Sequence, residues 1–171
     1  MEGNLIEQII LEWLDTNRDY AVILVPVLAF AESCIGIGLF VSGVLLLLVS
    51  ATLYNNGLVG LEVILSLSFV AALLGDHSGY YIARFMGPKF HQLKLVRKYQ
   101  STVIRAEDLI RSHGSAAIFI GRFTPAIRSI IPAMVGISGF RRMRYSVLDA
   151  LACLAWTLAL GALLLGIDGI F

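Results

Sequence analysis

The sequence of 171 residues contains few charged side chains: aspartate, glutamate, lysine and arginine make up 15% of it, whereas hydrophobic residues make up 58%. A soluble domain usually carries about 25% charged residues, so this shortage excludes an ordinary soluble domain and predicts an integral membrane protein. The only two cysteines, Cys34 and Cys153, lie in separate apolar stretches. We therefore expect neither a disulfide framework nor a metal site, and assign both cysteines to packing.

Two further absences bear on function. The sequence has three histidines and no Ser-Gly-His element, and neither His91 nor His113 lies in a strongly apolar segment. A membrane enzyme that modifies lipid phosphates would need such a base near its cationic groups, so we expect no enzyme.

The net charge is +1, and we expect no nucleic-acid partner and no cofactor. No cleavable signal is expected either, because the first apolar run, near Ala21, follows an acidic stretch.

Two apolar segments, 58–83 and 145–167, are each long enough to cross a hydrocarbon core of about 30 Å. The segment 21–54 is too long for one spanning helix, because 34 residues would extend about 51 Å, and too short for two. It therefore predicts a re-entrant helical hairpin. The segment 114–140 contains two helix-breaking prolines, Pro125 and Pro132, and predicts a second re-entrant hairpin.

Basic residues lie on both sides of the second predicted hairpin. They are Lys94, Arg97, Lys98, Arg105 and Arg111 before it, and Arg141, Arg142 and Arg144 after it. Positive residues are enriched on the cytoplasmic side, so both ends of 114–140 are expected there. Residues 88–112 form a basic, amphipathic cytoplasmic connector in this interpretation, and residues 1–20 a short amphipathic helix at the membrane interface.

The expected fold is a single all-α integral membrane domain over residues 1–171. It consists of two inverted units, each a re-entrant helical hairpin plus a transmembrane helix, joined by the basic amphipathic connector. Inverted repeats with broken helices that meet near the midplane are typical of secondary transporters. The chain is therefore expected to pass through its membrane several times.

Three charged residues inside the apolar hairpins form the candidate substrate site: Glu32 in the first, and Arg122 and Arg128 in the second. An arginine at bilayer depth costs about 2.5–3.5 kcal/mol on insertion scales, so both need a partner or a ligand. A continuous helix would place them about 240° apart, but a break at Pro125 lets them converge. Guanidinium groups bind phosphate oxygens in a fork, which favours a phosphate ligand. The alternative is that both arginines reach the cytoplasmic headgroups or pair only with Glu32 and Asp76.

Asp76, His77 and Arg84 lie towards the end of the first predicted span. They are candidates for a proton relay or for a structural ion pair, in which Asp76 would pair with Arg84. For His77 alone, a structural role is the simpler interpretation. Coupling of the site to H+ or Na+ stays open at this point.

These residues also resemble a known family, the DedA proteins, which are bacterial relatives of the eukaryotic VTT-domain lipid scramblases. The resemblance covers most of the chain and depends on Glu32 with the glycines after it, Gly75-Asp76, Gly79-Tyr80, Arg84, Gly87, Phe119, Gly121-Arg122, Pro125, Arg128, Pro132, Gly136 and Trp156. It implies paired re-entrant hairpins and movement of phospholipids or lipid-linked phosphates, such as undecaprenyl phosphate, across the bacterial inner membrane.

The chain departs from that pattern in two places. Many members carry a second membrane acid about a dozen residues after the first, where this chain has Ser42-Gly43-Val44, and this puts proton coupling in doubt. We also expect no counterpart of the further C-terminal helix of those members after 145–167. We expect a transporter, flippase or scramblase whose partner is a lipid or lipid-linked phosphate, and a homodimer is plausible. The alternative is a structural factor for the cell envelope without transport.

Overall fold

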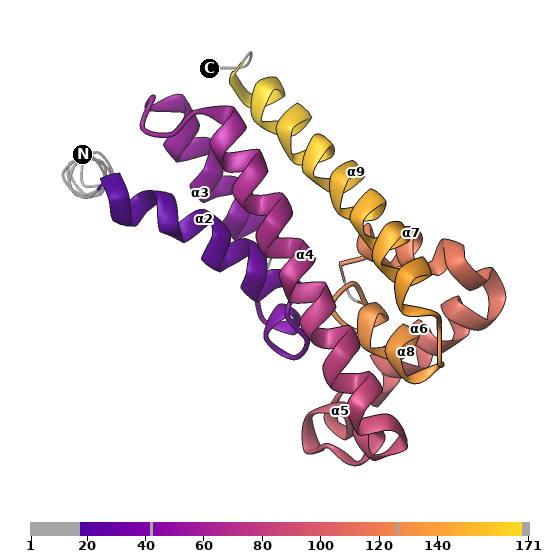
Figure 1. Cartoon of the computed structure of the whole chain (residues 1–171). Coiled ribbons are helices and arrows are strands. Elements are labelled where there is room, and N and C mark those ends of the chain that lie inside the picture. Colours follow the sequence, from indigo (N-terminus) through magenta and orange to yellow (C-terminus); the bar gives the residue numbers. More distant parts are fainter. Residues whose placement is uncertain (1–17, 42, 126, 169–171) are drawn as a thin grey trace.

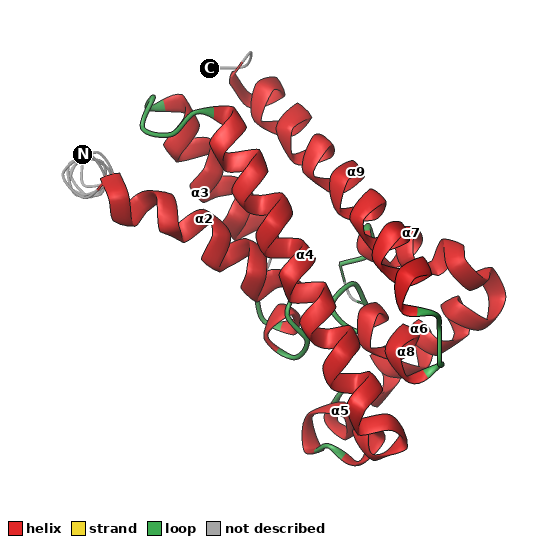
Figure 2. Cartoon of the chain, viewed as in Figure 1, coloured by secondary structure: helices red, strands yellow, loops and turns green. Residues whose placement is uncertain are grey.

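The computed structural model describes residues 18–41, 43–125 and 127–168 (Figure 1). The regular structure of these residues is all helical, and Figure 2 shows helices joined by short loops. This confirms the expected all-α class. The expected interfacial helix over 1–20 falls almost entirely outside the described residues. The elements in chain order are α2 (Arg18–Ser33), η1 (Ile37–Leu39), α3 (Gly43–Asn55), α4 (Leu61–Met86), η2 (Gly87–Gln92), α5 (Lys94–Lys98), α6 (Gln100–His113), η3 (Gly114–Ala116), α7 (Ala117–Arg122), α8 (Ile131–Ile137) and α9 (Arg142–Asp168).

Two long helices, α4 and α9, form the frame of the molecule (Figure 1). They contain 26 and 27 residues, so each extends about 40 Å. Both are long and apolar enough to cross a membrane. Helix α4 ends at Gly87, whose φ of 55° lies in the left-handed region that favours glycine. The two helices overlap the predicted spans 58–83 and 145–167; α4 begins and ends three residues later than predicted, and α9 begins three residues earlier.

The first predicted hairpin, 21–54, forms two helices, α2 and α3, that contact each other. They contain 16 and 13 residues, or about 24 and 20 Å, and each is shorter than a hydrocarbon core. The chain reverses at Gly36, whose φ is 85°. A Cβ at Gly38 would collide with the backbone carbonyl of Glu32, so the reversal is tight. The structure thus has a helical hairpin here, and its entry and exit on one membrane side stay a prediction.

The second predicted hairpin, 114–140, has a short helix on each side of a break. Helix α7 has six residues and α8 has seven, and Pro125 lies in the non-helical stretch between them. Pro132 was also predicted to break a helix, and this prediction is wrong. It lies in the first turn of α8, where a proline is well placed because the N–H that it lacks would have no partner within the helix.

Helix α4 lies at the centre of the packing and contacts α2, α8 and α9. One apolar cluster joins it to α2, α3 and α9 around Leu46, Ile64 and Leu164. A second cluster joins it to α6, α8 and α9 around Tyr80, Ile131 and Tyr145. Each hairpin therefore has its own core, and the two long helices contribute to both.

Large apolar side chains are also exposed on the outer faces of α3, α4 and α9. They include Leu45, Leu48, Val63, Val70, Leu74, Leu158 and Leu165. Water disfavours such a surface, whereas lipid chains do not. This surface fits the membrane setting that the two long helices indicate.

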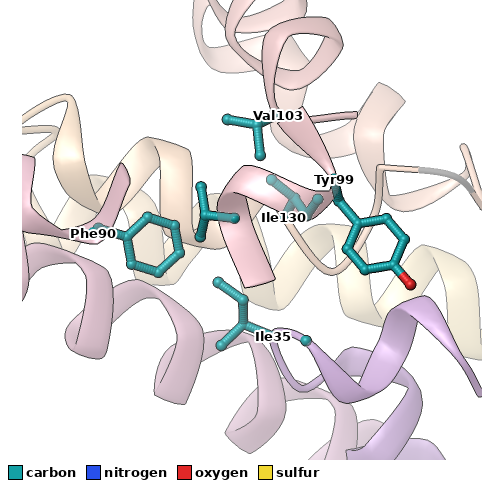
Figure 3. Close-up of a pocket in the computed structure, with 7 residues that line it drawn as sticks. Ile35, Phe90, Tyr99, Val103 and Ile130 are labelled. Carbon is teal, nitrogen blue, oxygen red and sulfur yellow. The ribbon is translucent and has the colours of Figure 1, made fainter. Parts of the chain in front are cut away.

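The predicted connector, 88–112, forms η2, α5 and α6, and it contacts the reversal of the first hairpin. Figure 3 shows Ile35 from that reversal facing Phe90, Tyr99, Val103 and Ile130. The pocket between them is apolar and has a volume of only about 20 Å³, little more than one water needs. It is therefore a packing contact between hairpin and connector, and we assign no ligand to it.

The topology prediction can be tested with Lys98→Cys and Arg142→Cys, introduced separately after Cys34 and Cys153 are replaced by serine. Both positions are exposed. We expect that an impermeant thiol reagent added from outside the cell labels neither position until the membrane is opened, because positive segments stay in the cytoplasm. Labelling of one position but not the other from outside would mean that 114–140 crosses the membrane.

Candidate functional site

Two buried ion pairs connect the first half of the chain to the second. Arg128 pairs with Glu32, and Arg122 pairs with Asp76. Glu32 and Asp76 are each 2% exposed and Arg122 is 8% exposed. Burial of a single charge is very costly unless an opposite charge lies beside it. The four side chains come from α2, α4, the end of α7 and the turn before α8, so the Glu32–Arg128 pair joins the two hairpins and the Asp76–Arg122 pair joins the second hairpin to α4.

The two arginines converge on one aromatic ring. Their guanidinium carbons lie 5.5 Å (Arg122) and 5.4 Å (Arg128) from the centre of the Trp156 ring, which α9 provides. These are cation–π distances. The break around Pro125 makes this possible, since a continuous helix would direct the arginines to different sides. The ring thus holds two positive groups side by side.

Three buried polar atoms of these pairs form no hydrogen bond within the described part of the chain. They are Nη2 of Arg128, Nε of Arg122 and Oε2 of Glu32. Unused buried donors cost about 1–3 kcal/mol each. The two guanidiniums therefore retain the capacity to donate hydrogen bonds to an anion.

A cavity of about 330 Å³ adjoins the arginines. Its polar wall contains Glu32, Arg122 and Arg128, and the rest of the lining comes mainly from α3 and α9. Val44, where relatives were expected to carry a second acid, also lines it. Both arginines that line the cavity are already paired with a carboxylate, so an anion in the cavity would compete with Glu32 and Asp76 for them.

Gly43, at the start of α3, is placed where only a glycine fits beside the Glu32–Arg128 pair. A Cβ there would overlap Oε1 of Glu32. Since the atom it meets is the end of a side chain, the carboxylate would have to move while the backbone could stay. The absence of a side chain at Gly43 therefore leaves room for the Glu32 carboxylate and is not required by the backbone conformation.

We predict that Gly43→Ala displaces the Glu32 carboxylate from Arg128 and lowers the free energy of unfolding by about 1–3 kcal/mol, the cost of an unsatisfied buried polar group. Gly166→Ala is the matched control, since Gly166 lies within α9 and has open space around its Cβ position. Thermal unfolding of the two purified variants in detergent measures the difference. Equal midpoints would show that Gly43 has no such role.

A second polar network lies beside Asp76, and sequence analysis missed its main member, Asp149 of α9. Nδ1 of His77 lies 3.2 Å from a carboxylate oxygen of Asp149, which is 2% exposed. The other ring nitrogen of His77 lies 3.0 Å from the hydroxyl of Ser146. The Cys153 thiol donates to Asp76 at 3.7 Å. His77 and Asp76 thus each have a polar contact across the α4–α9 interface.

A sequence signal for Asp149 did exist. Asp149, Cys153 and Trp156 follow one another at intervals of four and three residues, so they share one face of a helix. The donor atoms of Asp76, Asp149 and Cys153 lie within 4.8 Å of one another, a spacing that could hold a cation. The Arg122 guanidinium already occupies Asp76, however, and its charge opposes a metal ion there.

The expected ion pair between Asp76 and Arg84 is wrong. Arg84 instead donates to the carbonyl of Phe140 at 2.8 Å and to the hydroxyl of Tyr80 at 2.9 Å. Arg84 follows Asp76 by eight residues on α4, a rise of about 12 Å, so the two groups are far apart along the helix. Arg84 thereby fixes the end of the second hairpin to α4.

Comparison with known proteins gives a family match over most of the chain. The model of the VTT domain matches residues 37–164, a range that contains the site residues above except Glu32. Inner membrane protein YqjA of Escherichia coli K12 is 30% identical over 142 residues, which cover 80% of this chain and 63% of YqjA. Inner membrane protein YabI of the same organism is 24% identical over 141 residues, 80% of this chain and 54% of YabI.

An uncharacterized membrane protein of Buchnera aphidicola (subsp. Schizaphis graminum) is 23% identical over 137 residues, 80% of this chain and 54% of that protein. The chain thus spans between about half and two thirds of the length of these curated relatives. No solved structure matches the chain significantly.

Proposed function

The chain belongs to the VTT domain (DedA) family of membrane proteins, and from that premise we propose that it moves phosphate-bearing lipids across the bacterial inner membrane. The proposed substrates are phospholipids or polyprenyl phosphates of the undecaprenyl phosphate type. The proposed site is the cavity beside Arg122 and Arg128. No covalent step is proposed, so the protein would act as a flippase or scramblase rather than as an enzyme.

The observation that carries this proposal is the convergence of two guanidiniums on one ring beside a cavity that both arginines line. A phosphate accepts paired hydrogen bonds from the planar guanidinium fork, and the charge of arginine does not vary with pH in the physiological range. A carboxylate ligand would accept the same bonds, but a lipid phosphate presents more oxygens and more charge. A phosphate headgroup is therefore the ligand that uses both arginines best.

The depth of the site also supports transport. Trp156 lies close to the middle of α9, and Asp76 lies a little past the middle of α4. If both helices cross the bilayer, the arginines lie near its midplane, where secondary transporters bind their substrates. A headgroup bound there would be about halfway between the two leaflets.

Glu32 gives this site a resting state. In the structure its carboxylate pairs with Arg128, which stabilises the guanidinium in the apolar surroundings. An incoming phosphate would compete with Glu32 for that arginine, while Asp76 continues to hold Arg122 in place. Release of the lipid would restore the Glu32–Arg128 pair, so the carboxylate would gate the site.

A structural role is the competing function, because the ion pairs could serve only to join the hairpins. That interpretation explains the pairs themselves. It does not explain why a cavity of this size adjoins them. We therefore favour transport.

Glu32→Gln separates these functions. If Glu32 gates the site, the variant leaves Arg128 without its counter-charge, and we expect tighter binding of anionic lipid together with slower movement between leaflets. If Glu32 instead carries a proton, only the pH-dependent part of the rate should disappear. The measurement is lipid movement in vesicles that contain the purified protein, made from mildly acidic to mildly alkaline pH. An unchanged rate at every pH would leave Glu32 a structural residue.

A further inference from the structure

The cavity beside the arginines has two chemically different ends. The polar end is the arginine wall already described. The remainder is a groove between α3 and α9, lined by Val44, Leu47, Phe123, Ala159, Leu160 and Leu163. Apart from the polar end, these lining side chains offer no charge. A ligand that fills the whole cavity therefore needs an anionic part and an apolar part.

The apolar lining follows the helix periodicity, so the groove has a direction. On α9, Trp156, Leu160 and Leu163 recur at intervals of four and three residues and share one face. On α3, Gly43 and Leu47 are four residues apart and likewise share a face. From Trp156 to Leu163 the helix rises about 10 Å. The groove thus begins where Arg122 and Arg128 contact Trp156 and continues along α9 for about a third of the thickness of the hydrocarbon core.

The groove is open on its outer side. Leu163 is 54% exposed and Val44 is 60% exposed, whereas Leu160 at the floor is 5% exposed. Leu163 and Val44 therefore form apolar lips that border the surroundings of the protein. In a membrane those surroundings are lipid chains.

We infer that the α3–α9 groove is a subsite for one hydrocarbon chain of the lipid whose phosphate is held by Arg122 and Arg128, an inference that rests on the proposed function. The chain gains little hydrophobic energy there, because it already lies in an apolar medium. What the groove provides is a lateral path. The headgroup reaches the buried arginines while its chain stays in apolar surroundings and never passes a charged side chain.

The groove can be filled without a change at the arginines by Leu163→Trp. Leu165→Trp is the matched control, since Leu165 is 52% exposed and lies about 200° away around the same helix. Dipalmitoyl phosphatidic acid in nanodiscs probes the whole site, and glycerol phosphate probes the headgroup end alone. We expect Leu163→Trp to weaken binding of the long-chain lipid about tenfold relative to Leu165→Trp, because the indole takes the space that the chain needs once the headgroup is bound. Both variants should bind glycerol phosphate like the unaltered chain.

Equal binding of the long-chain lipid by both variants would overturn the groove assignment and leave the phosphate site standing. Failure of the unaltered chain to bind either ligand would overturn the proposed function, and the inference with it. Formation of a disulfide-linked dimer by Leu163→Cys, but not by Leu165→Cys, would mean that a second copy of this chain covers the groove. That result would also overturn the inference.

A second measurement does not depend on the folding of a groove variant. Phosphatidic acid with a photoreactive diazirine on one acyl chain is crosslinked to the unaltered protein and to Arg128→Lys, which keeps the charge opposite Glu32. We expect labelling of Leu47 and Leu163 to fall in Arg128→Lys, because the headgroup is held less tightly, and labelling of Leu165 by bulk lipid to stay the same. Equal labelling of the groove in both proteins would contradict the inference.

Discussion

Replacement of Arg122 by methionine is expected to abolish lipid movement and to reduce the amount of folded protein in the membrane. The substitution keeps most of the side-chain volume, so the loss of charge is the main change. Asp76 would then be buried without its partner, close to Asp149. Removal of one member of a buried pair typically costs about 3–5 kcal/mol, a large part of the stability of a small protein. Thermal unfolding and vesicle assays measure the two effects.

The double variant Arg122→Met with Asp76→Asn separates stability from function. Removal of both charges of a buried pair is often nearly neutral, so we expect folded protein to return towards its normal amount. Lipid movement should stay absent, because Arg128 alone cannot hold the phosphate from two sides. Recovery of both properties would mean that Arg122 serves only to neutralise Asp76, and the structural interpretation would then hold.

Arg128→Lys is expected to keep the fold and to lose most of the activity. Lysine retains the positive charge opposite Glu32, but it lacks the planar fork and stacks less well on Trp156. The loss of one charge-assisted hydrogen bond, at about 1.5 kcal/mol, would slow lipid movement roughly tenfold. Arg105→Lys, on the exposed face of α6, is the matched control and should move lipid at the normal rate.

The Arg128→Lys result can be interpreted only if a normal amount of the variant is inserted in the membrane. In that case, a normal rate of lipid movement would show that a positive charge at this position is enough. It would contradict the proposal that the planar guanidiniums of Arg122 and Arg128 hold the phosphate, here called the phosphate clamp. A low rate in both Arg128→Lys and Arg105→Lys would indicate a general effect of the substitution and would also count against the clamp.

The coarse architecture could be predicted because it depends on length and composition. The segments 58–83 and 145–167 are long and apolar, so they became the two long helices. The run 21–54 could be recognised as a hairpin because its 34 residues fit neither one span nor two. Pro125 could be recognised as a break because a proline cannot continue the hydrogen bonds of a helix. The entry and exit sides of both hairpins stay predictions.

The details of the site depend on contacts between residues far apart in the sequence. The sequence offered two partners for Asp76, namely Arg84 and the arginines of the second hairpin. The structure confirms the second alternative, since the fold brings Arg122 to Asp76 from 46 positions away. Asp149 was passed over because its importance arises only when α9 packs on α4. Gly43 was read as part of a missing acidic motif, and its contact with Glu32 became visible only in three dimensions.

The central claim is that lipids move because the two arginines hold their phosphate, and the most direct test compares two headgroups on the same acyl chains. Vesicles with the purified, unaltered protein are loaded either with fluorescent phosphatidic acid or with a fluorescent glycolipid whose neutral galactose headgroup lacks phosphate. Movement between leaflets is followed for each. We predict that the protein moves phosphatidic acid and leaves the galactolipid at the rate of protein-free vesicles. Equal acceleration of both lipids, or of neither, would contradict the claim.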